Sequence, residues 1–518
     1  MKKYLFIALA AFGFAACTEK GEENAPVQNA ELEQSYMAIT LAADDITRAD
    51  EPEYEEGLAA ERAVESAYVF FFKDGAAFPV AFDGTTSTNA GPNNYLKVDL
   101  TTVDQDMPNV SDVKDAVLVL QNYKGEYPNK IVAVLNWAPT KSSYTLSELK
   151  TQISNLQGVN NGFVMSNAVY ADKADQTVDA VDLTIDNIGK TAEEALANPV
   201  TIHVERVAAK VVFTAKDNGR FDIEKEIEGK KVYAQIKGFE LYNDYQESWL
   251  IKRINPAWEV GFNWNDYNYF RSYWAQSLGK SFDENTFAWN TDNTAINGWV
   301  YCGENTREWT AEADVRTKVV VKAQLVDAEG NPFEVVNWYG KDYIGEENLL
   351  KVVANTLKNT YFSKENTTLT GLTPADIKCV DRLVTDAKAY EVYFQLSDEG
   401  AAKTWNKYEN GNYTAISVED LNAALADVQP ALVYNDGMTY YWLDIKHLGT
   451  AGSTAEYGIV RNHVYKVNIN DITGYGTPVY DGTTDFINLE KPEDIVTYVS
   501  AQINILSWRV VENNYDLN

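Results

Sequence analysis

Cysteine and histidine are scarce in this chain, and their scarcity excludes several kinds of protein. Three cysteines stand among 518 residues, too few for the disulfide framework of a small secreted domain. Cys302 and Cys379 could pair in an oxidising compartment, but two buried free thiols are the state we expect. The three histidines, His203, His447 and His463, show no spacing that would bring two of them to one metal ion. The sequence therefore predicts no metal site and no cofactor.

Catalytic motifs are also missing. The chain contains no HExxH, GxSxG, Walker or CxxC sequence, so zinc and nucleophilic catalysis have no support. Its 76 acidic residues are so numerous that any carboxylate pair chosen for glycoside hydrolysis would be arbitrary. We expect neither an enzyme nor any catalytic residue.

Positive charge is in short supply. The chain has 44 Lys and Arg against 76 Asp and Glu, which gives a formal net charge of −32 and a pI near 4.5. Nucleic acid and anionic lipid surfaces both require a basic face on the protein, so we expect neither as a partner. An acidic surface of this kind keeps an extracellular protein dispersed.

Long apolar runs are absent except at the amino terminus. The segment "MKKYLFIALAAFGFAAC" has two lysines, an apolar stretch from Tyr4 to Phe14, and small residues before Cys17. This anatomy is typical of a signal peptide and is too short for a transmembrane helix. Ala15-Ala16-Cys17 resembles a bacterial lipobox, which implies removal of residues 1–16 and lipidation of Cys17. An ordinary secretory signal with an incidental Cys17 is the alternative.

Aromatic and β-branched residues are what the chain has in abundance. Its 32 Tyr, 20 Phe and 12 Trp fall in short alternating runs separated by Gly, Asn and Asp. This pattern predicts a mainly β fold of sandwich type with short inserted helices. The clearest strands are expected at 66–72, 116–120, 130–137, 200–215, 317–326, 439–445 and 463–471. Helices are expected at 145–157 and 417–428, which begin with the caps Thr145 and Ser417, and at 347–359.

The sequence predicts a division of the chain into two large domains. A long strand run ends at Ala215, and "KDNGR" follows with charge and turn chemistry, which predicts a boundary near 216–220. We expect an amino-terminal domain over 49–217 and a carboxy-terminal domain over 218–496. The aromatic stretch 258–274 could stack on sugar rings, but packing of a long loop onto a sheet is the simpler interpretation.

Both ends of the chain carry strand patterns. Tyr36 to Ala42 places Met37, Ile39 and Leu41 on one face, and an acidic linker with Arg48-Ala49 follows. At the other end, Thr497 to Val511 predicts one long strand with a one-residue change of phase at Leu506. The apolar positions of this strand are Val499, Ala501, Ile503, Ile505, Trp508 and Val510.

Several segments, in their order along the chain, resemble one known family. They are the lipobox, "SYMAITL", an arginine before "AD", "VERVAAKVVF", "VRNHVYKVNINDI" and "INILSWRVV". The set resembles the Bacteroidia type V pilins, or fimbrillins, and is most similar to the shaft subunit of the short (minor) fimbria. The resemblance covers the first 75 residues, 200–215 and about 440–518.

The resemblance implies a fold and a processing route. It implies two tandem transthyretin-like β-sandwich domains, delivery to the outer membrane as a lipoprotein precursor, and cleavage by an arginine-specific protease. By position, the cut falls between Arg48 and Ala49, with Arg62-Ala63 as a rival site.

The implied function is that of a structural subunit of an adhesive surface fimbria. The strand 36–42, within a pro-segment 17–48, would complete the amino-terminal sandwich until the cut removes it. Residues 497–518 of another copy would then take its place and give head-to-tail growth, with tip and anchor subunits as further partners. An anchor subunit and a monomeric glycan-binding surface lipoprotein are the alternatives.

Overall fold

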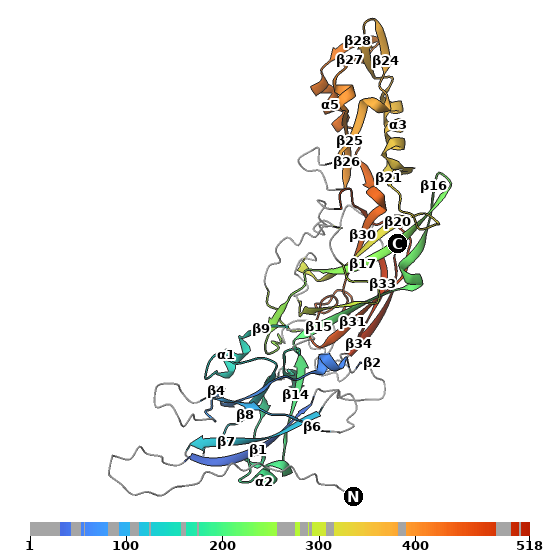
Figure 1. Cartoon of the computed structure of the whole chain (residues 1–518). Helices are drawn as coiled ribbons and strands as arrows, with labels where there is room; N and C mark the ends of the chain where they lie inside the picture. Colours follow the sequence, from blue (N-terminus) through green and yellow to red (C-terminus); the bar gives the residue numbers. More distant parts are fainter. Residues whose placement is uncertain are drawn as a thin grey trace, which may run out of the picture.

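The fold is described from a computed structural model. It covers residues 32–42, 53–55, 57–80, 93–103, 113–123, 126–156, 162–173, 176–255, 275–279, 289, 293–306, 315–381, 390–482, 499–506 and 509–517. These residues form an elongated, mainly β molecule with one sheet near the amino-terminal end, a sandwich in the middle and a lobe at the far end (Figure 1). No helix among them is long and apolar enough to cross a membrane.

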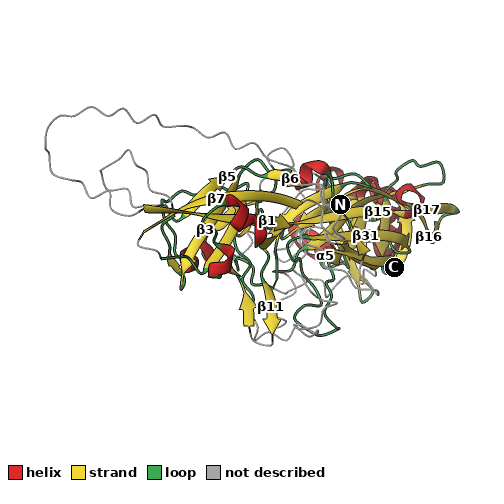
Figure 2. Ribbon diagram, turned by 90° about the horizontal axis from the view of Figure 1, so that it is seen from below, coloured by secondary structure: helices red, strands yellow, loops and turns green. Residues whose placement is uncertain are grey.

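The amino-terminal sheet forms because alternating and continuous apolar runs pair side by side. Its strands follow the order β4-β3-β8-β10-β14-β1-β7-β6, with β13 and β5 attached to β8 and β3. Figure 2 shows β1 alongside β7 in this sheet. The strands are β1 (Leu32–Ala42), β3 (Ala67–Lys73), β4 (Ala76–Ala77), β5 (Tyr95–Val98), β6 (Thr101–Val103), β7 (Val113–Tyr123), β8 (Lys130–Leu135), β10 (Met165–Asn167), β13 (Val181–Asp182) and β14 (Val200–Arg206).

Smaller elements flank this sheet. Thr145 caps α1 as predicted, but the helix ends at Lys150, where the expected helix continued to 157. The chain instead enters β9, which pairs with β18 and so ends the helix early. These elements are α1 (Leu146–Lys150), β9 (Ile153–Asn155), β11 (Tyr170–Lys173), β12 (Gln176–Val178), α2 (Ala192–Ala197) and β18 (Glu247–Trp249).

The middle of the molecule is a two-layer sandwich. A six-stranded sheet, β19-β15-β31-β33-β34-β2, faces a five-stranded sheet, β16-β17-β20-β30-β32, across an apolar core that includes Phe213, Phe239 and Tyr465. Its strands are β2 (Glu53–Tyr54), β15 (Ala208–Ala215), β16 (Arg220–Ile227), β17 (Lys230–Tyr242), β19 (Trp299–Gly303), β20 (Lys318–Val326), β30 (Met438–Asp444), β31 (His463–Ile472), β32 (Thr477–Pro478), β33 (Val499–Leu506) and β34 (Arg509–Leu517).

The run 200–215 is two strands rather than the one predicted. It breaks at Val207, so that β14 belongs to the amino-terminal sheet and β15 to the six-stranded sheet. A continuous apolar run carries no signal for a change of sheet, because residues on both sides of the break are buried. The turn predicted at "KDNGR" is present, with Asp217 and Asn218 at φ 50° and 55°, but it joins β15 to β16 within the sandwich.

The part of the chain that follows β20 and precedes β30 forms a separate apolar core, which the sequence did not predict as a separate unit. It holds a five-stranded sheet, β22-β21-β29-β26-β25, a four-stranded sheet, β24-β23-β27-β28, and the helices α3 and α5. Ser417 caps α5 as predicted. The elements are β21 (Val335–Trp338), β22 (Lys341–Ile344), α3 (Gly345–Leu357), β23 (Tyr361–Glu365), β24 (Thr368–Gly371), β25 (Ile377–Asp381), β26 (Glu391–Leu396), α4 (Asp398–Ala401), β27 (Thr404–Glu409), β28 (Asn412–Ile416), α5 (Val418–Ala426) and β29 (Ala431–Tyr434).

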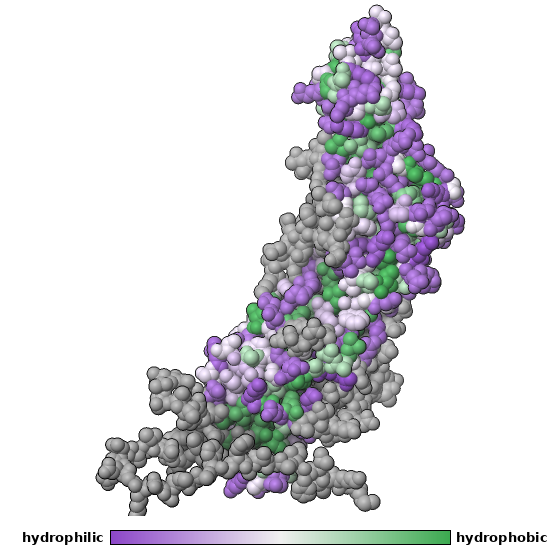
Figure 3. Space-filling model, in the orientation of Figure 1, coloured by the Kyte–Doolittle hydropathy of each residue, from purple (hydrophilic) through white to green (hydrophobic). Residues whose placement is uncertain are grey.

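The structure places the scarce cysteines and histidines and shows the character of the surface. Cys302 and Cys379 are both free, the first buried and the second half-buried. Hydrophilic side chains cover most of the upper part of the molecule, with small hydrophobic patches between them (Figure 3). His447 and His463 do come together, with ring centroids 5.3 Å apart, although their sequence spacing gave no sign of it. Among the described residues, no group of three or more metal-ligating side chains gathers.

Candidate functional site at the two chain ends

The first strand lies inside the amino-terminal sheet rather than at its edge. All of β1 pairs antiparallel with β7, from Leu32 opposite Tyr123 to Ala42 opposite Val113. Its last four residues also pair parallel with β14, from Ile39 to Ala42. The strand predicted over 36–42 is therefore present and begins earlier, at Leu32, because the ladder with β7 continues through its polar residues.

Two of the three predicted inward residues of β1 are fully buried. Met37 and Ile39 are 0% and 1% exposed, within a core that includes Leu118 of β7 and Ile202 of β14. Leu41 lies on β1, but its side chain is outside the described residues. Burying two large apolar side chains stabilises the fold by about 3 to 6 kcal/mol. Loss of β1 would leave a groove with two unpaired strand edges and a core open on one side.

The carboxy-terminal segment forms two strands, so the prediction of one long strand is wrong. β33 ends at Leu506, where the sequence pattern changes phase, and β34 begins at Arg509 and runs antiparallel to β33. β33 also pairs with β31, from Val464 opposite Leu506. The return of the chain satisfies backbone groups that one long strand would leave at an open edge.

The predicted donor residues fall on these two strands of the chain's own sandwich. Val499, Ala501, Ile503 and Ile505 lie on β33, and Val510 lies on β34. Trp508 is outside the described residues. β1 and the carboxy-terminal strands belong to different sheets, so the structure does not bring the two predicted sets together within one chain.

Several other predicted sites cannot be placed. Cys17, Arg48 and Ala49 lie outside the described residues, and so does the aromatic stretch 258–274. The rival site, Arg62-Ala63, is described. Arg62 ends a short 3-10 helix, Ala59–Arg62, and the carbonyl of Ala63 accepts a hydrogen bond from Asn136 Nδ2 at 2.8 Å.

A buried carboxylate next to Arg62 ties this helix to the sandwich. Glu61 is fully buried, and its Oε1 accepts hydrogen bonds from Lys210 Nζ at 2.7 Å and from the Tyr301 hydroxyl. Its backbone carbonyl accepts a hydrogen bond from Arg206 Nε at 2.8 Å. Burial alone would raise the pKa of Glu61, but the hydrogen bonds from Lys210, Tyr301 and the Leu58 amide outweigh it and lower the pKa.

The segment before this helix reaches the carboxy-terminal strands. β2 pairs antiparallel with β34, with Glu53 opposite Val510 and Tyr54 opposite Arg509. Glu55 forms an ion pair with Lys466 of β31. The stretch from Glu53 to Glu61 therefore contacts β34 near one edge of the six-stranded sheet and β15 near the opposite edge.

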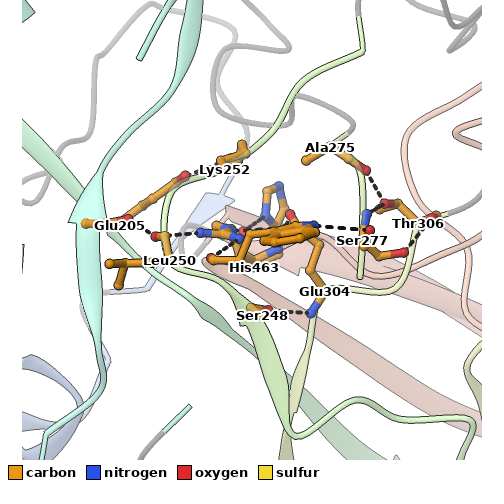
Figure 4. Close-up of polar contacts among 12 residues, drawn as sticks. Glu205, Ser248, Leu250, Lys252, Ala275, Ser277, Glu304, Thr306 and His463 are labelled. Carbon is orange, nitrogen blue, oxygen red and sulfur yellow. Dashed lines mark hydrogen bonds and ion pairs between the residues drawn. The ribbon is translucent and has the colours of Figure 1, made fainter. Parts of the chain in front are cut away.

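Buried charges join the amino-terminal sheet to the sandwich. Arg461 is fully buried, and its Nε and Nη2 donate to Glu304 Oε2 at 3.1 and 3.0 Å. Lys252 Nζ donates to Glu205 Oε2 of β14 at 2.8 Å (Figure 4). Burial raises the pKa of Glu205, with Lys252 acting in the opposite sense. Removing one partner of such a pair leaves the other charge buried without a partner. These contacts therefore fix the junction between the amino-terminal sheet and the sandwich in one arrangement.

Arg461 also reaches backbone oxygens of the chain between these sheets. Its Nη2 donates to the Trp249 carbonyl at 2.7 Å, and its Nη1 contacts the Leu250 carbonyl at 3.4 Å. The Glu304 amide in turn donates to Ser248 Oγ at 3.2 Å. His463 Nδ1 lies 2.7 Å from the Arg461 carbonyl. This network leaves the Arg461 guanidinium well satisfied despite its burial.

Sequence reasoning missed the charged residues of this region. Glu205, Arg206 and Lys210 lie within "VERVAAKVVF", which served only as a mark of resemblance. A useful signal was present, because a charged residue inside a continuous apolar run must find a partner once buried. The partners could not be named, since Glu61 and Lys210 are far apart in the sequence.

Residues 432–514 match the model of the fimbrillin carboxy-terminal region, described as major fimbrial subunit protein type IV. The matched segment runs from β29 into β34 and so includes all of β33 and most of β34. It supports a relationship to the fimbrillins. A search among curated proteins finds no match.

Two solved structures show a remote likeness to the whole chain. One is a fimbrilin from Porphyromonas gingivalis, with 12% identity and a TM-score of 0.38, covering 93% of this chain and 98% of that one. The other is a putative cell adhesion protein from Bacteroides eggerthii, with 12% identity and a TM-score of 0.34, covering 94% and 99%.

Proposed function

We propose that this protein is a structural shaft subunit of an adhesive surface fimbria. In this account it is exported as an outer-membrane lipoprotein precursor, lipidated at Cys17 and cleaved between Arg48 and Ala49. Copies then join head to tail by strand exchange, with fimbrial tip and anchor subunits at the ends of the fibre. The fimbrillin match over 432–514 supports the family, and the internal position of β1 carries the mechanism.

The position of β1 explains why a cut would matter. Before cleavage β1 is part of the same chain, so its high effective concentration keeps other strands out of the groove between β7 and β14. After cleavage at Arg48 it becomes a detachable peptide. Burial of Met37 and Ile39 then holds it with about 3 to 6 kcal/mol before entropic costs.

The carboxy-terminal segment has the composition of a competitor for that groove. Its large apolar residues Val499, Ile503, Ile505, Trp508 and Val510 would contribute on the order of 8 to 15 kcal/mol if all were buried. Association entropy and the loss of its pairing with β31 reduce this margin. Addition of a strand to a sheet edge of the next copy does not close on itself, so the product is a filament.

The surroundings of Arg62 make it a poor cleavage site and so favour Arg48. Proteases bind an extended backbone, and the Arg62-Ala63 bond is held by the buried Glu61 on one side and by Asn136 on the other. Cleavage there would require local unfolding of this helix. A cut at Arg48 leaves the Glu61 contacts intact.

The presence of both a removable strand and a donor segment distinguishes a shaft subunit from its partners. A tip protein would not need a donor strand, and an anchor would keep its first strand and its lipid. A shaft subunit uses both ends in every copy.

Substitution of either arginine tests the proposal. Arg48→Ala is expected to accumulate as full-length, unassembled precursor, while the matched variant Arg62→Ala is cut and assembles like the wild type. Amino-terminal sequencing of surface material should begin at Ala49, and electron microscopy should show fibres only where cleavage occurs. Normal fibres from Arg48→Ala would refute the site, and cleaved wild-type protein that stays monomeric would refute the function.

A further inference from the structure

The segment that precedes the Glu61 helix crosses the outer face of the six-stranded sheet. Lys210 is opposite Val464, and Lys466 is opposite Val212, so both lysines lie on the same face of β15 and β31. Phe213 and Tyr465 alternate with them and face the sandwich core. Glu61 binds Lys210, and Glu55 binds Lys466.

Beyond Glu55 the chain reaches the far edge of the sheet. There β2 pairs with β34 and is the last strand in the order β19-β15-β31-β33-β34-β2. Followed from Glu61 back to Glu53, the segment thus contacts β15 and β19 through Glu61, then β31 through Glu55, and finally β34 through β2. Residues Glu53, Tyr54 and Glu55 are called the strap from here on.

We propose that the strap holds β33 and β34 in their own sandwich and that its release sets the rate at which the carboxy-terminal strands become available to another copy. This inference rests on the proposed function and adds a controlling element to it. β33 and β34 pair with β31 as well as with β2, and they cannot leave as a pair while β2 stays hydrogen-bonded to β34 and Glu55 stays bound to Lys466.

The two fastenings of the segment differ in strength. Glu61 is fully buried and binds Lys210 and Tyr301, whereas the Glu55 and Lys466 side chains are 38% and 23% exposed. An ion pair that water can reach contributes little, and β2 is only two residues long. The strap is therefore the end that opens first, while Glu61 keeps the rest of the segment in place.

The strap also links the cleavage to the release of the donor. In the uncut chain the strap is held at both ends, by Glu61 on one side and through the chain to β1 on the other. A cut at Arg48 leaves Glu53 only a few residues from a free end. Cleavage would then open the groove and loosen the donor of the same subunit in one step.

A reversible cross-link between strap and donor tests this directly. Glu53 and Val510 are Cα partners across β2 and β34, so the double variant E53C/V510C places two thiols in register. The control E365C/T368C places a cross-link between Cα partners of β23 and β24, in the far lobe. All chains are cleaved with an arginine-specific protease, and assembly is followed by light scattering and electron microscopy.

The oxidised strap variant is expected to form no filaments, and reductant should restore assembly to the wild-type rate. The oxidised control should assemble normally. Assembly of the oxidised strap variant at the reduced rate would overturn the inference and leave the proposed function standing. Failure of cleaved wild-type protein to assemble would overturn both.

Charge reversal supplies a second test that does not depend on a disulfide. Glu55→Lys faces Lys466 with a like charge, and we expect assembly of the cleaved chain to speed up by about two- to fivefold, as for loss of a partly exposed ion pair. The swap E55K/K466E should return to the wild-type rate. Glu347→Lys, which disrupts the exposed pair with Lys351 on α3, is the matched control and should change nothing. An unchanged rate in Glu55→Lys, or a swap that behaves like it, would contradict the inference.

Discussion

At the scale of single residues, the contacts that fix this molecule are buried charges with distant partners. Glu61 is bound by Lys210 and Tyr301, and Arg461 is bound by Glu304. Local sequence identifies such residues as unusual but cannot pair them, because electrostatic partners are set by the tertiary fold. Met37 and Ile39 were predictable, since alternation along one strand determines which side chains face the core.

Glu61 gives a prediction about stability and pH. Replacing it by Gln removes the charge that balances the buried Lys210, so Glu61→Gln should lower the free energy of unfolding by about 3 kcal/mol at pH 7. Because folding lowers the pKa of Glu61 below its ordinary value of 4.5, its stabilisation is present above that pH and is lost as the pH falls through the folded value.

Urea unfolding of both proteins at pH 7 and below pH 4 measures this effect, and the difference between them should shrink at the lower pH. The matched control is Glu126→Gln, whose carboxylate pairs with Lys73 at the surface and is 62% exposed. It should cost less than about 1 kcal/mol at either pH. A Glu61→Gln deficit that does not change with pH would contradict the assignment.

At the scale of elements, the sequence identified where strands lie better than where they turn. The runs at 66–72, 130–137, 317–326 and 463–471 all correspond to strands, because alternation and β-branched content report directly on a pleated surface. The end of β33 at Leu506 was not predicted. The dipeptide Ser507-Trp508 that follows is not one of the strong hairpin signals such as Asn-Gly or Asp-Gly, so the change of phase at Leu506 was the main sign.

If β1 is removed before assembly, its core residues should stabilise the precursor and not the fibre. Ile39→Ala should lower the stability of the uncut chain by about 2 to 4 kcal/mol, because it leaves a cavity in the core that Ile39 shares with Val200 and Ile202. It should also speed loss of the cleaved peptide without changing the stability of finished filaments, which no longer contain β1.

Thermal unfolding of precursor and filament separates these effects. Val117→Ala on the neighbouring strand β7, where the side chain is 38% exposed, serves as the control and should be nearly neutral in the precursor. Equal destabilisation of precursor and filament by Ile39→Ala would mean that β1 stays in the assembled subunit.

At the scale of the whole molecule, the assignment of strands to sheets is the feature that the sequence could not predict. The predicted mainly β fold is confirmed. The chain leaves the amino-terminal sheet at Val207, the turn at 216–220 joins the two sheets of the sandwich, and the residues between β20 and β30 in the chain form a further core. These features depend on which strands pair over long distances, and no local pattern encodes that choice. The division of the chain into the two predicted domains remains a proposal.

The central claim concerns two copies, so the decisive measurement joins an acceptor to a donor. The acceptor is cleaved protein that lacks residues 497–518 and carries Val117→Cys on β7, the Cα partner of Ala38. The donor is cleaved full-length protein with single cysteines at Ser500, Gln502 or Asn504 in turn, because these positions alternate with the apolar donor residues as Ala38 alternates with Met37 and Ile39. After mixing and mild oxidation, mass spectrometry identifies any disulfide between Val117→Cys and the donor segment.

The account predicts a cross-link between the two chains from at least one donor position, only when the acceptor has been cut at Arg48. An uncut acceptor, with β1 still in its groove, is expected to give none. The account is contradicted if no donor position reaches Val117→Cys in the cleaved acceptor, or if the uncut acceptor cross-links equally well.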